Sequence, residues 1–504
     1  MNQAAPARGA WSEAVVAGLV SALIMSVRLG DPGFWIDEIF TARWTRLSVG
    51  GLLAAVGADL HPPLFFLIER LVARAGGEGE AVLRFVPLLA GAATATAAYW
   101  AFHPALGARR ALWVSWAVAL APGFALYARM ARYYSLAALF ALVAHGLFAR
   151  LGTGKGKLGL WALYAMTVAL ALSTSYLTVC LIAAHGLWAL GADRSRRVFL
   201  GWLAAVAAAA LLLAPWGIVA ARQIGEAHAL MPAVAGGVKG WVLMLGYELH
   251  ALVAGEVLFP WEPAGALALL SGIVLLVLGV RAALRERAAR ASLLTGIHAM
   301  LLASALLAGV ARATPFVGLP ARTLYLWPFA AAFAVMGASA AKVPGRLLAA
   351  VWGAAMLVGW LHLYAADHAL NPIYLTPGRE AATEILRASA PSDLVLAEVD
   401  TGVSYYLERH SFPGPIADPI DTTATLRLIA GRPGAIWWAH LSRDGSARTR
   451  PEMPARNLLV RFGFVQRRTT YGWVDPTLAR IKRRLLGVPG YSHRLVLERY
   501  VPKI

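Results

Sequence analysis

Two adjacent carboxylates, Asp37 and Glu38, follow the first apolar run of the chain, within the aromatic-rich segment GFWIDEIF at residues 33–40. Burial among such residues raises the pKa of a carboxyl group, whereas a nearby cation or metal ion lowers it. Either setting suits a general base or a cation ligand. The structural alternative is that Asp37 caps a helix while Glu38 points to water.

A histidine followed by two prolines, His61-Pro62-Pro63, forms a second candidate segment. The prolines restrict the backbone where a loop turns into a helix. This restriction would hold His61 in a fixed position, where it could take part in chemistry. A lone histidine is more often a structural hydrogen-bonding residue than a ligand.

Arginine and tyrosine occur together twice, at Arg132-Tyr133 and between Arg322 and Tyr325. A guanidinium group binds a phosphate through two parallel N–H bonds. Both pairs lie at the ends of apolar runs, on the side that holds few other basic residues, and therefore favour an anionic partner such as a lipid phosphate. The alternative is that these side chains extend to the lipid interface.

The composition indicates a membrane protein. Of 504 residues, 59% are hydrophobic and 14% are charged, and the mean hydropathy is +0.61. A soluble domain carries about a quarter charged residues, and an apolar helix of about 20 residues spans a bilayer. The apolar runs predict about eleven transmembrane helices, at 12–29, 83–102, 111–127, 135–150, 159–174, 176–191, 199–220, 264–281, 291–310, 323–341 and 347–366.

The net charge is +19, but the basic residues form short clusters between apolar runs, which argues against nucleic-acid binding. The clusters after every second span hold 14 Lys/Arg and two acidic residues, whereas the opposite loops hold 11 Asp/Glu. By the positive-inside rule, the amino terminus is cytoplasmic and the acidic loops lie outside. The first run lacks a small-residue cleavage site and is predicted to be a retained helix.

The alternation of basic clusters and acidic loops also indicates whether two doubtful segments cross the membrane. Residues 61–75 are apolar but carry Glu69, Arg70 and Arg74, and counting them as a span would reverse the side of every later basic cluster. They are therefore predicted to form an amphipathic helix along the outer interface, as are residues 238–258.

After residue 370 the composition changes, because residues 371–504 carry 19 Lys/Arg, 12 Asp/Glu and no spanning run. Helices at 378–389 and 402–409 and strands at 394–398, 435–440 and near 458–474 indicate a small α/β domain. We predict a transmembrane domain at 1–370 and an extracytoplasmic, periplasmic domain at 371–504. The single cysteine, Cys180, excludes an internal disulfide.

The candidate residues suggest one site at the outer membrane–water interface. A carboxylate base would deprotonate an acceptor hydroxyl or amine while arginines neutralise the charge on a departing phosphate. The sequence contains no P-loop, HExxH, GxSxG or Cys/His metal cluster that would indicate another reaction.

In these residues the chain resembles the GT-C superfamily of membrane glycosyltransferases. It is most similar to the branch with protein O-mannosyltransferases and the aminoarabinose transferase of lipid A. The resemblance covers about residues 12–366, with an α/β tail like that of many bacterial members. It rests on Asp37-Glu38, His61-Pro62-Pro63, Arg84–Pro87, Ala131–Tyr133 and Arg322–Pro328.

The resemblance implies transfer, with inversion at the anomeric carbon, from a polyprenyl-phosphate–monosaccharide donor to a lipid, glycan or protein acceptor. The site would face the outside of the cytoplasmic (inner) membrane. Carried over by position, Asp37 would be the base, and Glu38 an acceptor or cation contact. Arg132 and Arg322 would contact the donor phosphate, with Tyr133 and Tyr325 beside them, and His61 would be a site residue of unassigned role. Some relatives bind a divalent cation and others need none, so any ligands here would be Asp37, Glu38 and His61.

Two other functions fit the sequence. A transporter or flippase for a lipid-linked sugar would carry ionisable residues in mid-membrane, whereas the charges here cluster at helix ends. A catalytically inactive GT-C-like binding protein would keep the same outer surface without the chemistry.

Overall fold

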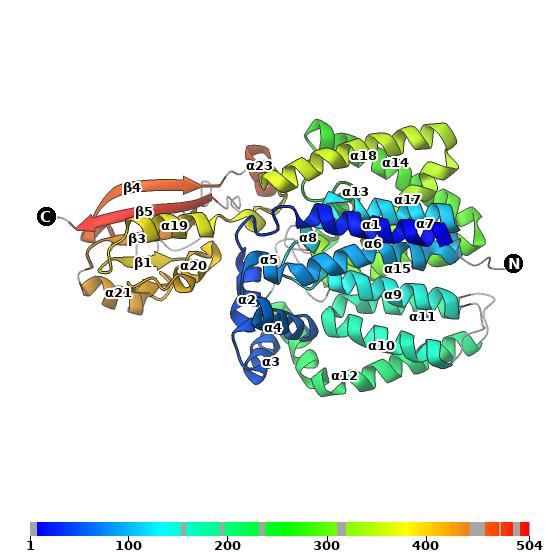
Figure 1. The fold of residues 1–504 in the computed structure, drawn as a ribbon, viewed down its shortest axis with the longest axis horizontal. Helices are drawn as coiled ribbons and strands as arrows, with labels where there is room; N and C mark the ends of the chain where they lie inside the picture. The colour runs from blue at the N-terminus through cyan, green and yellow to red at the C-terminus, as the bar shows by residue number, and fades with distance from the viewer. Residues whose placement is uncertain are drawn as a thin grey trace. The chain divides into compact units, whose positions relative to one another are not determined.

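The computed structural model describes residues 8–152, 158–191, 196–230, 237–309, 319–431, 433–442, 459–472, 475–486 and 494–502 (Figure 1). The chain forms two compact units. We call Met1–Leu29 with Trp44–His368 the helical unit, and Gly30–Arg43 with Ala369–Ile504 the C-terminal unit. The boundary predicted after residue 370 lies beside the division at His368. The sequence did not indicate that residues 30–43 belong with the tail.

The helical unit consists of helices throughout its described residues, and helix α2 (Ile36–Thr45) crosses the division between the units. The other helices are α1 (Arg8–Ser26), α3 (Val49–Gly57), α4 (Leu64–Gly76), α5 (Glu80–Leu83), α6 (Phe85–Leu106), α7 (Ala108–Ala119), α8 (Pro122–Ala128), α9 (Tyr134–Leu151), α10 (Leu158–Thr174), η1 (Tyr176–Thr178), α11 (Val179–Leu190), α12 (Arg196–Leu230), α13 (Gly237–Ala254), α14 (Pro263–Arg285), α15 (Arg287–Gly309), α16 (Leu319–Arg322), η2 (Leu324–Leu326), α17 (Trp327–Ala340) and α18 (Lys342–Ala365).

Seven of the described helices are long and apolar enough to cross a bilayer, and eight if the bent pair α7–α8 is one span. These eight coincide with eight of the eleven predicted spans. The other three predicted spans coincide with apolar helices shorter than 18 residues, at Leu158–Thr174, Tyr176–Leu190 and Leu324–Ala340. The predicted fold class, a polytopic helical membrane domain with a C-terminal α/β domain, is confirmed.

Helix α4 covers most of the segment 61–75 that was predicted to lie along the interface. Its 13 residues extend only about 20 Å at 1.5 Å per residue, which is less than the roughly 30 Å of hydrocarbon that a span must cross. Glu69 and Arg70 are buried on this helix, and the Arg70 Nε donates to the Leu47 carbonyl at 2.7 Å. The helix therefore packs Glu69 and Arg70 inward, while Arg74 in its last turn is exposed.

Helices α14 and α17 approach each other closely because glycines face each other's backbone. A Cβ added to Gly279 would lie 1.9 Å from the Phe333 carbonyl oxygen, and one added to Gly337 would lie 2.1 Å from that of Leu275. Small residues allow such backbone approach between membrane helices, where van der Waals packing is the main attraction.

The C-terminal unit is a five-stranded sheet with helices packed against it (Figure 1). The strand order is β2-β1-β3-β5-β4, in which β2, β1 and β3 are parallel and β5 runs antiparallel to both β3 and β4. Its elements are η3 (Pro372–Leu375), α19 (Gly378–Ala388), β1 (Leu394–Ala397), η4 (Val399–Thr401), α20 (Val403–Arg409), β2 (Ile416–Ala417), α21 (Thr422–Ala430), β3 (Ile436–Ser442), β4 (Gly463–Tyr471), α23 (Pro476–Leu486) and β5 (Arg494–Pro502).

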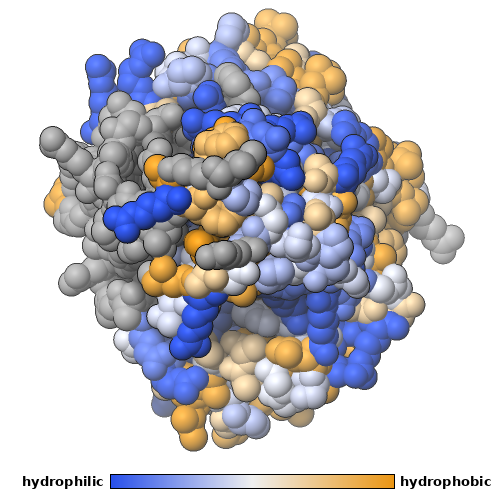
Figure 2. Space-filling view, turned by 90° about the vertical axis from the view of Figure 1, so that its left-hand side faces the viewer, coloured by the Kyte–Doolittle hydropathy of each residue, from blue (hydrophilic) through white to orange (hydrophobic). Residues whose placement is uncertain are grey.

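One core cluster of this unit forms on β1 and β3, where Leu394, Leu396, Ile436 and Trp438 pack with Leu459 and Tyr500. Seen from the side of this sheet, much of the described surface is hydrophilic, with smaller apolar patches between the polar side chains (Figure 2). This distribution differs from the apolar helices of the other unit and is typical of a domain that folds in water.

Asp393, at the start of β1, gives the first testable prediction. Its buried carboxylate accepts from the backbone N–H groups of Ala390 and Ala435 and from the Trp437 indole, at 3.0 to 3.1 Å. Asp393→Ala would leave two buried donors and one partly buried donor unpaired, so we expect it to lower the free energy of unfolding of this unit by about 3 kcal/mol. Faster amide hydrogen exchange in β1 and β3 of the intact protein would measure the loss. Asp400→Ala, at a half-buried position, is the control, and equal exchange in both variants would contradict the assignment.

Candidate active site

The predicted carboxylates begin helix α2. Asp37 is half-buried and Glu38 is fully buried, both in the first turn. The Glu38 Oε2 accepts the Trp35 backbone N–H at 3.4 Å, which is one half of a capping box. Glu38 therefore does not point to water, and the structural alternative is wrong on that point.

Residues of the tail hold this carboxylate segment in place. The Tyr406 hydroxyl accepts the Phe34 backbone N–H at 2.5 Å, and Arg379 donates to the Gly30 carbonyl at 2.9 Å. Arg379 also pairs with Asp31. At the other end of the segment, Arg43 forms an ion pair with Glu408 at 3.1 Å. The position of Asp37 thus depends on α19 and α20, which lie more than 300 residues further along the chain.

A second group of predicted residues meets inside the helical unit, around His61. The Arg132 Nη2 lies 2.7 Å from the His61 Nε2, and Arg132 is only 2% exposed. The His61 ring centroid lies 5.1 Å from that of Tyr133, and the Arg132 Cζ lies 5.6 and 5.7 Å from the ring centroids of Tyr133 and Phe66. We call His61, Arg132, Tyr133 and Phe66 the arginine pocket.

The backbone at His61 is fixed from helix α12. The Gln223 side-chain amide donates to the carbonyl oxygens of Val56, Asp59 and His61 at 2.9, 2.6 and 3.3 Å. Gln223 itself accepts from the Tyr176 hydroxyl at 2.6 Å. Since four main-chain or side-chain groups converge on one amide, the loop before α4 holds His61 in a defined position, as the two prolines predict.

His61 is neutral in this setting. Burial, followed by the positive charges of Arg132 and Arg322, holds the pKa of His61 well below its usual value of 6.5. A neutral imidazole accepts a hydrogen bond through Nε2, which suits the Arg132 donor beside it. Because that nitrogen is engaged with a cationic group, the geometry disfavours His61 as a metal ligand. Arg322 lies close enough to act on His61 electrostatically, so both predicted arginines belong to this region.

The depressed pKa of His61 predicts a specific pH dependence of stability. Below pH 6.5 the unfolded chain binds a proton at His61 that the folded chain does not, so stability falls as the pH falls, by up to about 1.4 kcal/mol per pH unit. We therefore expect His61→Gln to flatten the drop in melting temperature between pH 7 and pH 5, measured on the detergent-purified protein. The exposed His410 supplies the control variant, His410→Gln, which should melt as the wild type does. An unchanged drop in His61→Gln would disprove the role.

The remaining predicted residues have separate places. The buried Tyr325 hydroxyl donates to the Leu177 carbonyl at 2.9 Å and so connects η2 to η1. Asp37 and Glu38 belong to the C-terminal unit. Seven residues were proposed from the sequence. Four of them gather in the helical unit, namely His61, Arg132, Tyr133 and Arg322. Tyr325 instead forms the hydrogen bond that connects η2 to η1.

Sequence reasoning missed two buried carboxylates near these elements. The Thr323 hydroxyl donates to Glu248, and the Tyr127 hydroxyl donates to Glu256. Both glutamates were counted only as charges of the outer loops, although both are at most 2% exposed. Their polar neighbours in an otherwise apolar sequence, Thr323 and Tyr127, are the signal that could have identified them.

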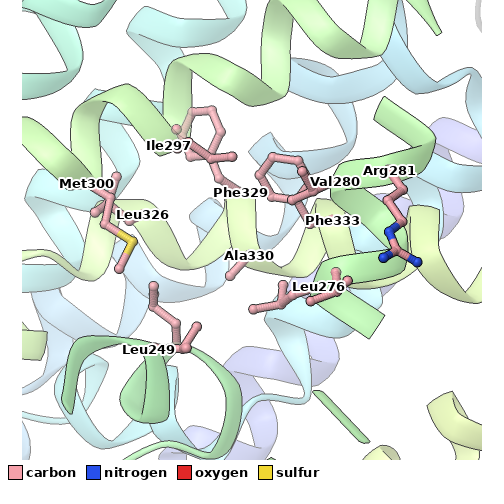
Figure 3. A pocket seen from close by; sticks show the side chains of 13 residues that line it. Leu249, Leu276, Val280, Arg281, Ile297, Met300, Leu326, Phe329, Ala330 and Phe333 are labelled. Carbon is pink, nitrogen blue, oxygen red and sulfur yellow. The ribbon is translucent and has the colours of Figure 1, made fainter. Parts of the chain in front are cut away.

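The helical unit also contains an apolar pocket of about 410 Å³. Its walls come from α13, α14, α15, η2 and α17, and Arg281 is its charged lining residue (Figure 3). Among the labelled side chains, Leu249, Met300, Phe329 and Phe333 surround the cavity. Such a lining suits a hydrocarbon chain and provides no carboxylate for sugar chemistry.

Residues 60–218 match the sequence model of the dolichyl-phosphate-mannose-protein mannosyltransferase family. No curated protein matches the chain in sequence. Among solved structures, the chain is similar to ArnT from Cupriavidus metallidurans bound to undecaprenyl phosphate, with a TM-score of 0.55, 12% identity, and coverage of 98% of each chain. It is also similar to the oligosaccharyltransferase AglB from Archaeoglobus fulgidus, in complex with an inhibitory peptide and a dolichol-phosphate. That match has a TM-score of 0.52 and 13% identity, and it covers 98% of this chain and 88% of that one.

The chain has the fold of the GT-C membrane glycosyltransferases. This GT-C fold confirms the resemblance predicted from the ordered motifs. The family match at residues 60–218 contains His61, Arg132 and Tyr133, so the arginine pocket lies within the segment where sequence and fold agree. Asp37 and Arg322 lie outside the matched segment.

Proposed function

We propose that the chain is a glycosyltransferase that moves a monosaccharide from a polyprenyl-phosphate-linked donor to an acceptor at the outer face of the cytoplasmic membrane. In this proposal the amino terminus is cytoplasmic and the C-terminal unit is extracytoplasmic, in accordance with the positive-inside distribution of Lys and Arg. The observation that carries it is the arginine pocket, a buried cationic site within a GT-C fold.

The electrostatics of the arginine pocket support a phosphate-bearing donor. Burial, and after it the charges of Arg132 and Arg322, depress the pKa of His61, so the local potential is positive where burial limits screening by water. The neutral His61 orients the Arg132 guanidinium without cancelling its charge. A positive, partly dehydrated pocket of this kind favours a phosphate or a developing phosphate anion.

The proposed reaction is an inverting substitution at the anomeric carbon. Asp37 removes the proton from the acceptor hydroxyl or amine, and the acceptor atom forms a bond to the anomeric carbon. The bond between that carbon and the phosphate oxygen breaks, and its electron pair leaves with the polyprenyl phosphate, whose charge Arg132 and Arg322 stabilise. Glu38 fixes the start of α2 and so positions Asp37.

The similar structures support a lipid-linked donor by analogy of fold. ArnT from Cupriavidus metallidurans was solved with undecaprenyl phosphate, and AglB with a dolichol-phosphate. We propose that this chain binds a polyprenyl phosphate of the same chemical kind, and that the apolar pocket in Figure 3 receives hydrocarbon. The acceptor is a lipid, a glycan or a protein.

The test is a transfer assay with purified protein in liposomes that contain radiolabelled polyprenyl-phosphate sugars. We expect labelled sugar to leave the lipid and appear on an acceptor fraction from the cell envelope, together with stoichiometric free polyprenyl phosphate. Movement of intact lipid-linked sugar between leaflets, without cleavage from the phosphate, would replace this proposal with the flippase. Neither cleavage nor movement, with donor binding retained, would point to the binding protein.

A further inference from the structure

A separate cluster of potential ligands lies where helix α18 ends and helix α14 begins, within the helical unit. Glu262, His362 and His368 each offer one ligand atom, and these atoms all lie within 4.8 Å of one another. All three side chains are partly buried. The sequence separates Glu262 from the histidines by 100 residues, so only the tertiary fold brings them together.

The end of helix α18 explains how the two histidines meet. His362 lies in the last turn, and Ala366 has the left-handed conformation (φ 53°) with its N–H bonded to the His362 carbonyl at 2.9 Å. This turn reverses the chain and returns His368 to His362, so that their ring centroids lie 3.7 Å apart. Glu262 caps the start of α14, and Phe259 packs on the His368 ring at 4.8 Å.

We propose that Glu262, His362 and His368 bind one divalent transition-metal ion, with zinc as the best fit. Two imidazoles and a carboxylate form a three-residue zinc ligand set that leaves the fourth position to water or to another side chain. Tetrahedral zinc with ligands near 2.1 Å places them about 3.3 Å apart, so rotation of partly exposed side chains is enough to close the site. Calcium and magnesium prefer oxygen ligands alone, which disfavours them here.

Asp367 supplies the supporting contact that such sites need. Its Oδ1 lies 2.8 Å from the His368 Nδ1 and 3.1 Å from the His362 Nδ1. The opposite nitrogen of His368, Nε2, faces Glu262 at 3.1 Å. A carboxylate that accepts a hydrogen bond from the Nδ1–H group fixes the tautomer of the histidine and leaves Nε2 for the metal. Asp367 therefore orients both histidines, and its exposed position also allows it to become the fourth ligand.

The charges around Glu262, His362 and His368 favour a bound cation over hydrogen bonds among these side chains alone. Two carboxylates, Glu262 and Asp367, lie beside the two tilted imidazole rings, and the carboxyl end of α18 adds partial negative charge. One divalent ion would balance the charge of the two carboxylates. The ion would join α18 to α14 at His368, the last residue of the helical unit before the chain enters the C-terminal unit.

Metal binding can be tested without any transfer assay. Full-length protein, freed of its affinity tag, stripped with a chelator and dialysed in detergent, is titrated with Co²⁺ and Zn²⁺. We expect one equivalent of Co²⁺ with the absorption of a four- or five-coordinate ion, its displacement by Zn²⁺, and a higher melting temperature with Zn²⁺ than after chelation. Uptake of less than 0.1 equivalent by the wild type, or no change in the visible spectrum, would overturn the proposal.

Variants then locate the ion. Asp367→Asn should weaken Zn²⁺ about 10- to 100-fold, as loss of a supporting contact does, and His362→Gln or His368→Gln should weaken it further. His410→Gln removes an exposed histidine elsewhere and should bind as the wild type does. Equal binding by His368→Gln and His410→Gln would place the ion elsewhere and reject the site. Because the readouts are stoichiometry, spectrum and melting, failure of sugar transfer leaves this test unaffected.

Discussion

An Asp37→Asn protein should transfer sugar on the order of 10²–10⁴ times more slowly than the wild type, because asparagine cannot accept the proton of the acceptor and a positioned general base contributes about that factor. The side chains are nearly isosteric, and Asp37 is half-buried at a helix amino terminus. We therefore expect the variant to fold and to bind donor normally. The measurement is the initial rate of transfer in liposomes at saturating donor.

The matched control for Asp37 is Glu78→Gln. Glu78 lies in the same expected outer loop and forms a partly exposed ion pair with Arg46 at 2.7 Å, an interaction worth at most about 1 kcal/mol. This control removes one carboxylate charge from the loop and should leave the rate unchanged. Full transfer by Asp37→Asn would remove the catalytic assignment, while an equal loss in both variants would indicate a general effect of charge.

Arg132→Gln should lower the rate of transfer by on the order of 10²–10³, as loss of one preorganised donor to a developing anion does. Arg132 is 2% exposed and is held between His61, Phe66 and Tyr133. Its guanidinium is therefore fixed before the phosphate arrives. Arg132→Lys keeps the charge but loses the planar pair of donors, so we expect only partial recovery.

The comparison for Arg132 is the exposed Arg74 in the last turn of α4. Arg74→Gln removes the same charge without disturbing the arginine pocket and should transfer at the wild-type rate. Melting temperature and monodispersity of the Arg132 variants distinguish loss of chemistry from loss of folding. A folded Arg132→Gln protein with unchanged rate and unchanged donor KM would exclude the phosphate contact.

The sequence predicted the helical architecture well because membrane spans are a local property. Each span is a run of apolar residues, and the bilayer enforces its length. The interfacial reading of residues 61–75 depended only on local charges and on the alternation of basic clusters, and α4 has the expected short length. Strand β5 was missed because its apolar residues are interrupted in sequence by Glu498 and Arg499, so that no clear alternation of apolar and polar residues is visible.

The parts that could not be predicted depend on contacts between distant segments. The aromatic residues around Glu38 indicate a setting in which burial is expected, but its complete burial within the C-terminal unit depends on the tertiary fold. The meeting of His362 and His368 with Glu262 depends on a left-handed residue at Ala366 and on the pairing of two helix ends. By contrast, Arg132 and His61 were proposed as members of one site from their residue types and from their expected position at the outer membrane–water interface. The Arg132 Nη2 lies 2.7 Å from the His61 Nε2.

The attachment of residues 30–43 to the tail has a consequence for how such proteins are divided and recombined. Tyr406, Arg379 and Glu408 hold the backbone and side chains of the segment that carries Asp37. A chimera joined at residue 370 would therefore separate the early segment that carries the proposed base from the late residues that shape it. The two pieces must therefore match each other, although more than 300 residues of the chain lie between them.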